Sequence, residues 1–296
     1  MRRGIVLVGL LMVGVLSIAA SQATQAPQRN ITVDKLTDNL FVLKGGGGNT
    51  AAFITSGGVV VVDTKNPGWG QPILDTIRTL TDKPVTMLIN THTHGDHVGG
   101  NPEFRPTVDI VVQENTRANM ERMEAFKTSE SRGMAKRTFK DRLTIGRGAD
   151  QIDLYYFGPG HTNGDAWIVF PALRTAHAGD IFARKSIPLI DPNNGGSVLR
   201  YPETLSKAHA GLVGVDTIIN GHNDTTTTLA DLEMFSEFMR DYVAWAQTEL
   251  KAGKTPEQAA AEFKVPEKYP GFSGTASTLF GGMAGQLKLL AEEMKK

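Results

Sequence analysis

The sequence predicts an α/β fold in which two mixed β-sheets pack against each other and helices cover their outer faces. Short runs rich in β-branched residues alternate with segments of helical spacing in both halves of the chain. Each half begins with strands, and the pattern from Thr228 onward is helical. At 296 residues, the chain has room for one large domain of this kind or for two small ones.

In the first half, the clearest element is "VVVVDT" at 59–64, whose length and β-branched content predict a buried strand. The predicted strands of this half are 39–44, 51–55, 59–64 and 85–90. A helix is predicted at 73–80, before Asp82-Lys83-Pro84. Four glycines at 45–48 lack both the Lys-Ser/Thr of a phosphate loop and the spacing of a dinucleotide fingerprint. We interpret them as a hairpin turn that lets the backbone approach a site closely.

The second half repeats this rhythm and ends in helices. Its predicted strands are 109–112, 143–145, 151–157, 166–170, 173–182 (running into a loop) and 215–220. Its predicted helices are 114–128, 201–212, 230–252, 255–263 and 276–295. In the helix at 255–263, Thr255 is the expected cap and Pro256 occupies the first turn. Residues 230–296 thus form a helical C-terminal part.

The first 23 residues predict a secretory signal peptide. A basic start, Met1-Arg2-Arg3, precedes an apolar run from Gly4 to Ala20, and small residues allow cleavage after Ala23. The predicted domain is then 24–296, exported to the periplasm or secreted. An uncleaved anchor is the alternative, because the run nears the lower length for spanning a bilayer. After cleavage we expect no stable membrane span.

The composition excludes several kinds of partner and of catalytic or metal site. The formal net charge is zero, which gives no electrostatic reason to expect nucleic acid as a partner. The chain has no cysteine, which excludes disulfides, thiolate zinc sites, iron–sulfur clusters and a cysteine nucleophile. Any metal site must therefore use His, Asp and Glu.

Such a site is predicted at "THTHGDH" (91–97), which holds three of the seven histidines. Imidazole nitrogens and carboxylate oxygens suit zinc and its neighbours. Gly95 permits a turn, so that four donors on one loop can serve two adjacent metals. The candidates on this loop are His92, His94, Asp96 and His97. His161, Asp180 and His222 each lie just beyond a predicted strand end, where α/β folds assemble their sites.

This series, HxHxDH followed by His161 in "GHTNGD", Asp180 in "AGDIF" and His222 in "NGH", resembles the metallo-β-lactamase superfamily of binuclear metallohydrolases. The resemblance extends from "VVVVDT" to His222 and implies a four-layer αββα sandwich with the metal site at one edge. It implies that His92, His94 and His161 hold the first metal. Asp96, His97 and His222 would hold the second metal, with Asp180 bridging the two. Asp63 matches a family aspartate that supports the metal loop from behind.

The resemblance implies two zinc ions per chain, with iron or manganese as other metals that this donor set accepts. The reaction expected is attack on the carbonyl of an ester, thioester, lactone or amide by a metal-bound hydroxide. Asp96 would orient the nucleophile and transfer its proton. The partner is a small-molecule substrate, and the helical C-terminal part could wall the substrate groove or form a homodimer. The substrate-binding residues are unknown.

Three alternatives stay open. A periplasmic β-lactamase of the HxHxDH subclass, which this chain resembles, is compatible with export. That subclass lacks a bridging carboxylate, so Asp180 is a departure from its pattern. His92, His161 and Asp180 also form the two-histidine, one-carboxylate set of a mononuclear iron enzyme similar to persulfide dioxygenases. A zinc-binding protein without turnover is the third alternative.

The remaining polar candidates are assigned to structural roles. His177 and His209 do not follow strand ends in the register of the family, so we expect them outside the metal site. Lys185, Asn163 and Asp165 could touch substrate, but solvated or turn-forming roles are expected.

Overall fold

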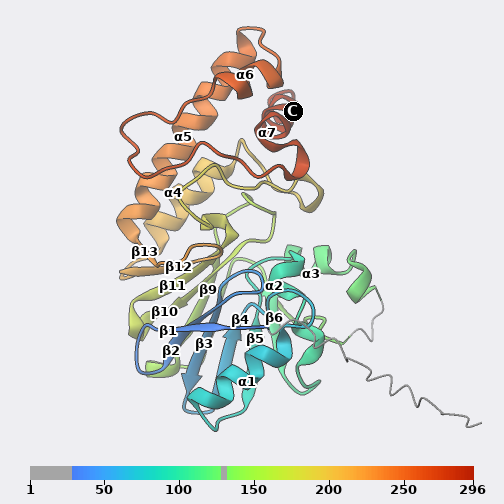
Figure 1. The fold of residues 1–296 in the computed structure, drawn as a ribbon, viewed down its shortest axis with the longest axis vertical. Helices are drawn as coiled ribbons and strands as arrows, with labels where there is room; N and C mark the ends of the chain where they lie inside the picture. Colours follow the sequence, from blue (N-terminus) through green and yellow to red (C-terminus); the bar gives the residue numbers. More distant parts are fainter. Residues whose placement is uncertain (1–28, 128–131) are drawn as a thin grey trace, which may run out of the picture.

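The computed structural model describes residues 29–127 and 132–296. Its strands form two mixed sheets, one of seven strands and one of six, with helices on the outer faces (Figure 1). The predicted sandwich of two mixed sheets is therefore confirmed. The predicted signal peptide at 1–23 lies outside the described residues.

The first sheet has its strands in chain order, from β1 to β7. They are β1 (Thr32–Lys35), β2 (Leu40–Lys44), β3 (Thr50–Thr55), β4 (Gly58–Val62), β5 (Val85–Ile89), β6 (Asp109–Gln113) and β7 (Arg137–Phe139). Strands β1 to β4 pair antiparallel, whereas β4 to β7 pair parallel. The carboxyl ends of β4 and β5 therefore lie at the same edge.

The second sheet has the order β13-β12-β11-β10-β9-β8. Its strands are β8 (Arg142–Ile145), β9 (Ile152–Tyr156), β10 (Ala166–Phe170), β11 (Thr175–Gly179), β12 (Thr217–Asn220) and β13 (Thr227–Thr228). Only β11 and β12 pair parallel, in a register that shifts between His177 and Gly179. This irregularity comes directly before Asp180.

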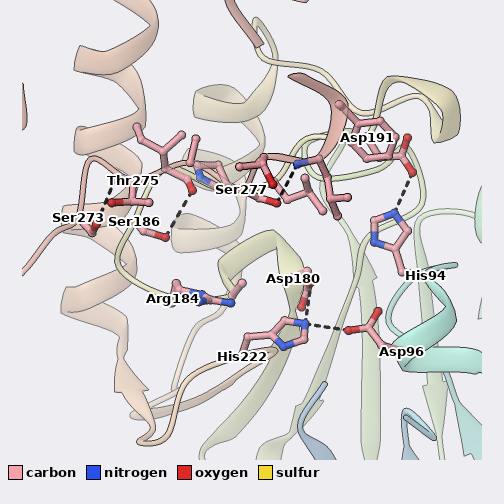
Figure 2. A pocket seen from close by; sticks show the side chains of 18 of the residues that line it. His94, Asp96, Asp180, Arg184, Ser186, Asp191, His222, Ser273, Thr275 and Ser277 are labelled. Carbon is pink, nitrogen blue, oxygen red and sulfur yellow. Dashed lines mark hydrogen bonds and ion pairs between the residues drawn. The ribbon is translucent and has the colours of Figure 1, made fainter. Parts of the chain in front are cut away.

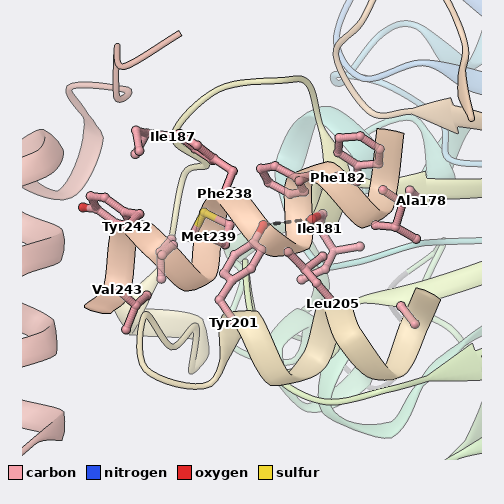
Figure 3. Close-up of a cluster of buried hydrophobic side chains, with 14 of the residues drawn as sticks. Ala178, Ile181, Phe182, Ile187, Tyr201, Leu205, Phe238, Met239, Tyr242 and Val243 are labelled. Carbon is pink, nitrogen blue, oxygen red and sulfur yellow. Dashed lines mark hydrogen bonds between the residues drawn. The ribbon is translucent and has the colours of Figure 1, made fainter. Parts of the chain in front are cut away.

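Three buried apolar clusters define the layers. The middle cluster joins the inner faces of both sheets, with Phe53 of β3 against Phe170 of β10 at 4.9 Å between ring centroids. The outer face of the first sheet packs on Ile73 and Ile77 of α1 (Gly70–Leu80). The outer face of the second sheet packs on α4 (Tyr201–Gly211) and α5 (Leu229–Lys251), as Figure 3 shows around Tyr201 and Met239.

The remaining helices are α2 (Gly95–Val98), α3 (Glu114–Met120), α6 (Pro256–Glu262) and α7 (Gly282–Glu293). Thr255 caps α6 as predicted, since its hydroxyl accepts from the Gln258 amide and the Gln258 side chain accepts from the Thr255 amide. In Figure 1, α5, α6 and α7 gather at the far end of the molecule from α1.

Two helix predictions were wrong in extent. The helix expected at 114–128 ends at Met120, and only a short 3₁₀ turn, Glu124–Phe126, follows. The helix expected at 276–295 begins at Gly282, because Phe280 and Gly281, directly before it, have positive φ angles that interrupt an α-helix. The short strands β1, β7 and β13 were not predicted, because their sequences TVDK, RTF and TT contain no apolar run.

No helix in residues 29–127 and 132–296 is long and apolar enough to cross a membrane.

Candidate metal centre

The donor residues predicted from the sequence lie at one edge of the sandwich, just past strand ends. His92 and His94 follow β5, and Asp96 and His97 lie in the single turn of α2. The remaining donors are His161 after β9, Asp180 after β11 and His222 after β12. Parallel pairing of β4 with β5 and of β11 with β12 brings these ends together.

The donor atoms form two groups. His92, His94, His161 and Asp180 make the first, and Asp96, His97 and His222 make the second. Within each group the donor atoms all lie within 4.8 Å of one another. The structure therefore divides the seven residues into two clusters of donors, each of a kind that could hold a metal ion.

Asp180 lies between the two groups. Its carboxylate oxygens are 3.8 Å from His161 Nε2 in the first group, and 3.3 Å from His97 Nε2 and 3.2 Å from His222 Nε2 in the second. Asp96 contacts the same nitrogen of His222, with Oδ2 3.2 Å from Nε2 (Figure 2). One carboxylate is thus within reach of donors from both groups.

The outer nitrogens of four rings are bonded to oxygen atoms. His97 Nδ1 lies 2.7 Å from Asp63 Oδ2, and His94 Nε2 lies 2.8 Å from Asp191 Oδ2. His161 Nδ1 is 2.7 Å from the Leu189 carbonyl oxygen, and His92 Nδ1 is 2.9 Å from Thr91 Oγ1. Such contacts fix the tautomer and orientation of a metal-binding imidazole. The opposite nitrogens are left to converge.

Two buried donors test whether a metal fits. His92 Nε2 is buried and has no hydrogen-bond partner within the described chain, and the buried Asp180 Oδ1 has only the His97 ring nitrogen near it, at 3.3 Å. A buried polar atom without a partner costs about 1–3 kcal/mol. Both atoms point into the convergent set of imidazole and carboxylate donors, so a divalent cation would satisfy them. The residues present fit a metal centre.

The charges in the site also favour the binding of a cation. Burial lowers the pKa of His97, but the Asp180 and Asp63 carboxylates outweigh burial and hold that pKa well above its usual value. Burial also lowers the pKa of His222, and its contacts with Asp180 and Asp96 outweigh this and raise it to about 9. The carboxylates thus draw positive charge to this spot, and metal ions would compete there with protons.

Asp63 has the position that its proposed support of the metal loop requires. It follows β4 with a φ of 62°, and it accepts hydrogen bonds from the Thr91 amide at 2.8 Å and the Thr91 hydroxyl at 2.7 Å. Together with its contact to His97, these bonds tie both ends of the metal loop to one carboxylate. A positive φ is rare for a residue with a side chain, and such strain concentrates at functional sites.

A groove opens beside the donors. Its lining comes from the metal loop, from the segment 183–191 and from the C-terminal segment 273–280. Figure 2 shows Asp180, His222 and Asp96 on one side of it, and Ser273, Thr275 and Ser277 across from them. Asp96 is 31% exposed there, so its carboxylate can reach a bound molecule.

A model of the metallo-beta-lactamase superfamily matches residues 43–233, which is more than half of the chain. The chain belongs to the metallo-beta-lactamase superfamily. The match includes every donor residue named above. The family match, the relatives and the two donor groups together identify this chain as a metal-dependent hydrolase.

Known relatives of this superfamily member are distant. It is 24% identical over 225 residues to the metallo-beta-lactamase type 2 of Elizabethkingia meningoseptica, covering 71% of this chain and 87% of the relative. It is 30% identical over 154 residues to the hydroxyacylglutathione hydrolase of Crocosphaera subtropica, covering 51% of each. The solved sec-alkyl sulfatase PisA1, a double mutant, matches with a TM-score of 0.73 at 14% identity, covering 89% of this chain and 50% of the sulfatase. The chain thus spans about half the length of the last two.

Sequence reasoning missed two residues of this metallohydrolase site. Asp191, which holds His94, lies in a loop and carries no motif. Lys65 is fully buried and donates to the carbonyl oxygens of Leu43 at 2.7 Å and Gly48 at 2.8 Å. No local pattern distinguishes either residue from an ordinary surface charge.

The glycine loop at 45–48 is the predicted hairpin turn, between the antiparallel strands β2 and β3. A side chain at Gly48 would collide with the His97 ring, and one at Gly47 would meet the Asp96 carbonyl oxygen. Lys65 holds the Gly48 carbonyl from behind. Glycine is required here because the backbone itself packs against the metal loop.

The residues assigned to structural roles stay outside the donor groups. His177 is buried in β11 and bonds to the Asn49 carbonyl oxygen and the Gly179 amide, whereas His209 lies in α4. Lys185 pairs with Asp231. Asp165 accepts from the amide and hydroxyl of Thr162, and Asn163 accepts from Asn119. None of these five residues lines the groove.

Proposed function

We propose that this chain is an exported hydrolase with two zinc ions that cleaves an ester, thioester, lactone or amide at its carbonyl carbon. The observation that carries the proposal is the division of seven donors into two groups with Asp180 between them. One metal would be held by His92, His94 and His161, the other by Asp96, His97 and His222, with Asp180 shared. Iron or manganese accepts the same donors.

When bound, two zinc ions supply a water molecule whose pKa falls from 15.7 to about 7 and a Lewis acid for the carbonyl oxygen. The protein supplies position and proton transfer. The outer contacts of Asp63 and Asp191 hold His97 and His94 in place. Asp96, partly exposed in the groove, orients the attacking water.

The reaction balances without a further reagent. The water oxygen adds to the carbonyl carbon, and the bond from that carbon to the leaving oxygen, sulfur or nitrogen breaks. Asp96 accepts the proton of the water and delivers it to the leaving group. The products are a carboxylic acid and an alcohol, thiol or amine.

The N-terminal sequence supports export, since a basic start, an apolar run and small residues precede residue 24. N-terminal sequencing of the protein recovered outside the cytoplasm tests this. A chain that begins at residue 24 supports export with cleavage, and a chain that keeps residues 1–23 in the membrane fraction supports the anchor.

A β-lactam is the second candidate substrate. The relative from Elizabethkingia meningoseptica, named as a metallo-beta-lactamase, is aligned over 87% of its length and favours it. Thioester hydrolysis draws the same kind of support from the hydroxyacylglutathione hydrolase. A panel of lactones, thioesters, esters and β-lactams therefore ranks the substrate classes.

Metal analysis of the purified protein tests the centre itself. About two zinc ions per chain, falling in Asp180→Asn and unchanged in His209→Ala, would support the binuclear hydrolase. His209 is the matched control, because it lies in α4 outside both donor groups. One iron and little zinc would instead favour an iron enzyme like the persulfide dioxygenases. Two zinc ions without turnover of any substrate would favour a zinc-binding protein.

A further inference from the structure

The C-terminal segment 273–280 forms one wall of the groove beside the metal centre. It lies beyond residue 233, where the match to the superfamily model ends. What this wall would bind is therefore a property of this chain, to be argued from its own contacts.

The wall is fixed to the opposite segment at Ser273, and α7 is bonded to the same segment beyond the wall. The Ser273 amide donates to the Lys185 carbonyl at 3.0 Å, and the Ser273 carbonyl accepts from the Ile187 amide at 3.2 Å. Beyond the wall, Gln286 of α7 donates to the Pro188 carbonyl at 2.7 Å. These bonds hold residues 273–280 at a fixed distance from 185–188 and leave the groove open between them.

The surface that faces the groove combines apolar side chains with polar ones, and Arg184 lines it beside Asp180 and His222. Its apolar members are Ala183, Ile187, Pro188, Leu189, Ala276, Leu279 and Phe280. Four large apolar side chains are exposed in the described part of the chain, and two of them, Leu279 at 61% and Phe280 at 41%, line this one groove. Exposed apolar side chains gathered in a groove mark a binding site.

Three serines that line the groove contact the local backbone. Ser273 Oγ accepts from the Thr275 amide at 3.1 Å, and Ser277 Oγ accepts from the Leu279 amide at 3.3 Å. Ser186 Oγ lies 3.4 Å from the Ile187 carbonyl oxygen. These serines, labelled in Figure 2, stabilise the local backbone.

Phe280 also has an unfavourable backbone. Its φ of 53° and ψ of 29° are left-handed, and Gly281 and Gly282 follow with positive φ. A bulky residue in this conformation costs roughly 1–2 kcal/mol relative to glycine. Glycine would therefore suit the backbone better, and the aromatic side chain must be explained by what it contacts.

Resting on the proposed hydrolase function, we propose that the groove binds an apolar acyl or alkyl group of the substrate, with Leu279 and Phe280 determining specificity. Charged groups gather at the metal end, where Asp96, Asp180 and His222 lie, and apolar side chains line the wall. A substrate with a reactive carbonyl and a long apolar chain matches both. Long-chain esters and lactones are therefore hydrolysed in preference to short ones.

The test uses the zinc-loaded mature enzyme, residues 24–296, with p-nitrophenyl acetate, butyrate and octanoate as substrates. We expect kcat/KM to rise at least about tenfold from acetate to octanoate, since each buried methylene favours binding. Phe280→Gly combined with Leu279→Ser should remove this rise and leave acetate hydrolysis within about twofold, because neither side chain belongs to the donor groups. Val213→Ser is the matched control, an 86% exposed apolar residue outside the groove, and should behave as wild type.

A binding measurement separates this inference from the proposed function. Octanohydroxamate should bind the wild type at least about tenfold more tightly than acetohydroxamate, and the double variant should bind both alike. If no ester is hydrolysed but this difference holds, ester cleavage is excluded from the proposed function and the apolar groove stands. If esters are hydrolysed without chain-length preference, the groove inference is overturned.

Two further readouts exclude other roles for the wall. Phe280→Gly alone should unfold at the same temperature as the wild type or higher, because strain is removed; a marked fall would mean that Phe280 is a packing residue and would overturn its role in specificity. Light scattering should give the same mass for wild type and double variant. If the wild type is a dimer and the double variant is a monomer, Leu279 and Phe280 form a dimer interface and do not bind substrate, which overturns the inference.

Discussion

At the metal edge, His92, His97 and His161 are buried, and each has its outer nitrogen bonded to an oxygen of the protein. Across the groove, Leu279 and Phe280 are exposed and contribute no polar contact to the site. The first region was assembled from strands far apart in the sequence, whereas the second is a single segment bonded to the opposite segment at Ser273. A change at the edge should therefore disturb chemistry, and a change in the wall should disturb only the choice of substrate.

The sharpest way to break this comparison is Asp180→Asn. It should lower kcat/KM by about a thousandfold, because a shared carboxylate supplies several kcal/mol through the metals it holds. Steady-state kinetics with metal content per chain measures this. A variant that keeps both metals and full activity would show that Asp180 is not shared between the two groups.

Asp63→Asn should act next most strongly, and at a distance from substrate. It removes the charge that holds His97 and Thr91, so zinc affinity should fall about 10–100-fold. Competition with a chromophoric chelator measures the affinity. The control is Asp216→Asn, which affects only an exposed pair with Arg174. Equal zinc affinity in both variants would refute the support role of Asp63.

Lys65→Met tests whether the glycine loop depends on its buried support. Loss of the donor to Leu43 and Gly48 should destabilise the fold by about 1–3 kcal/mol in the free energy of unfolding. Urea unfolding at pH 7 and at higher pH measures the change.

The pH dependence of that loss has a definite sign. Burial lowers the pKa of Lys65 to about 7, with Asp63 and Asp96 opposing it, against 10.5 in the unfolded chain. Between these values the unfolded chain binds the additional proton, so wild-type stability rises with pH. The variant lacks this rise, and its deficit should be larger at pH 9 than at pH 7. A deficit that shrinks over this range would contradict the burial of the amine.

The smallest effect is expected outside both regions. Thr255→Ala removes the cap of α6 and should cost about 1 kcal/mol of unfolding free energy. Metal content and the preference for octanoate should not change, because α6 contributes nothing to the groove lining. Thermal unfolding together with the ester series checks this. Loss of selectivity would mean that the wall depends on the whole helical C-terminal part.

The strands and the donor set could be predicted because their signals are local. β4 and β5 are short β-branched or apolar runs, and four donors occur together at 92–97. His161, Asp180 and His222 were found because each follows a strand end near a glycine. The helix expected at 276–295 is longer than the observed one. The apolar spacing of the sequence continues through residues 280–282, but their positive φ angles interrupt the helix.

By itself, the sequence determined the two-sheet sandwich and which residues can bind metal, because periodicity and residue chemistry are written along the chain. Only the tertiary structure decided which residues hold those donors and what faces them. Asp191 reaches His94 across 97 residues, Lys65 lies under the glycine loop, and the segment 273–280 closes the groove. These contacts depend on how distant elements pack, and a polar or apolar residue in a loop has no local pattern that reveals its partner.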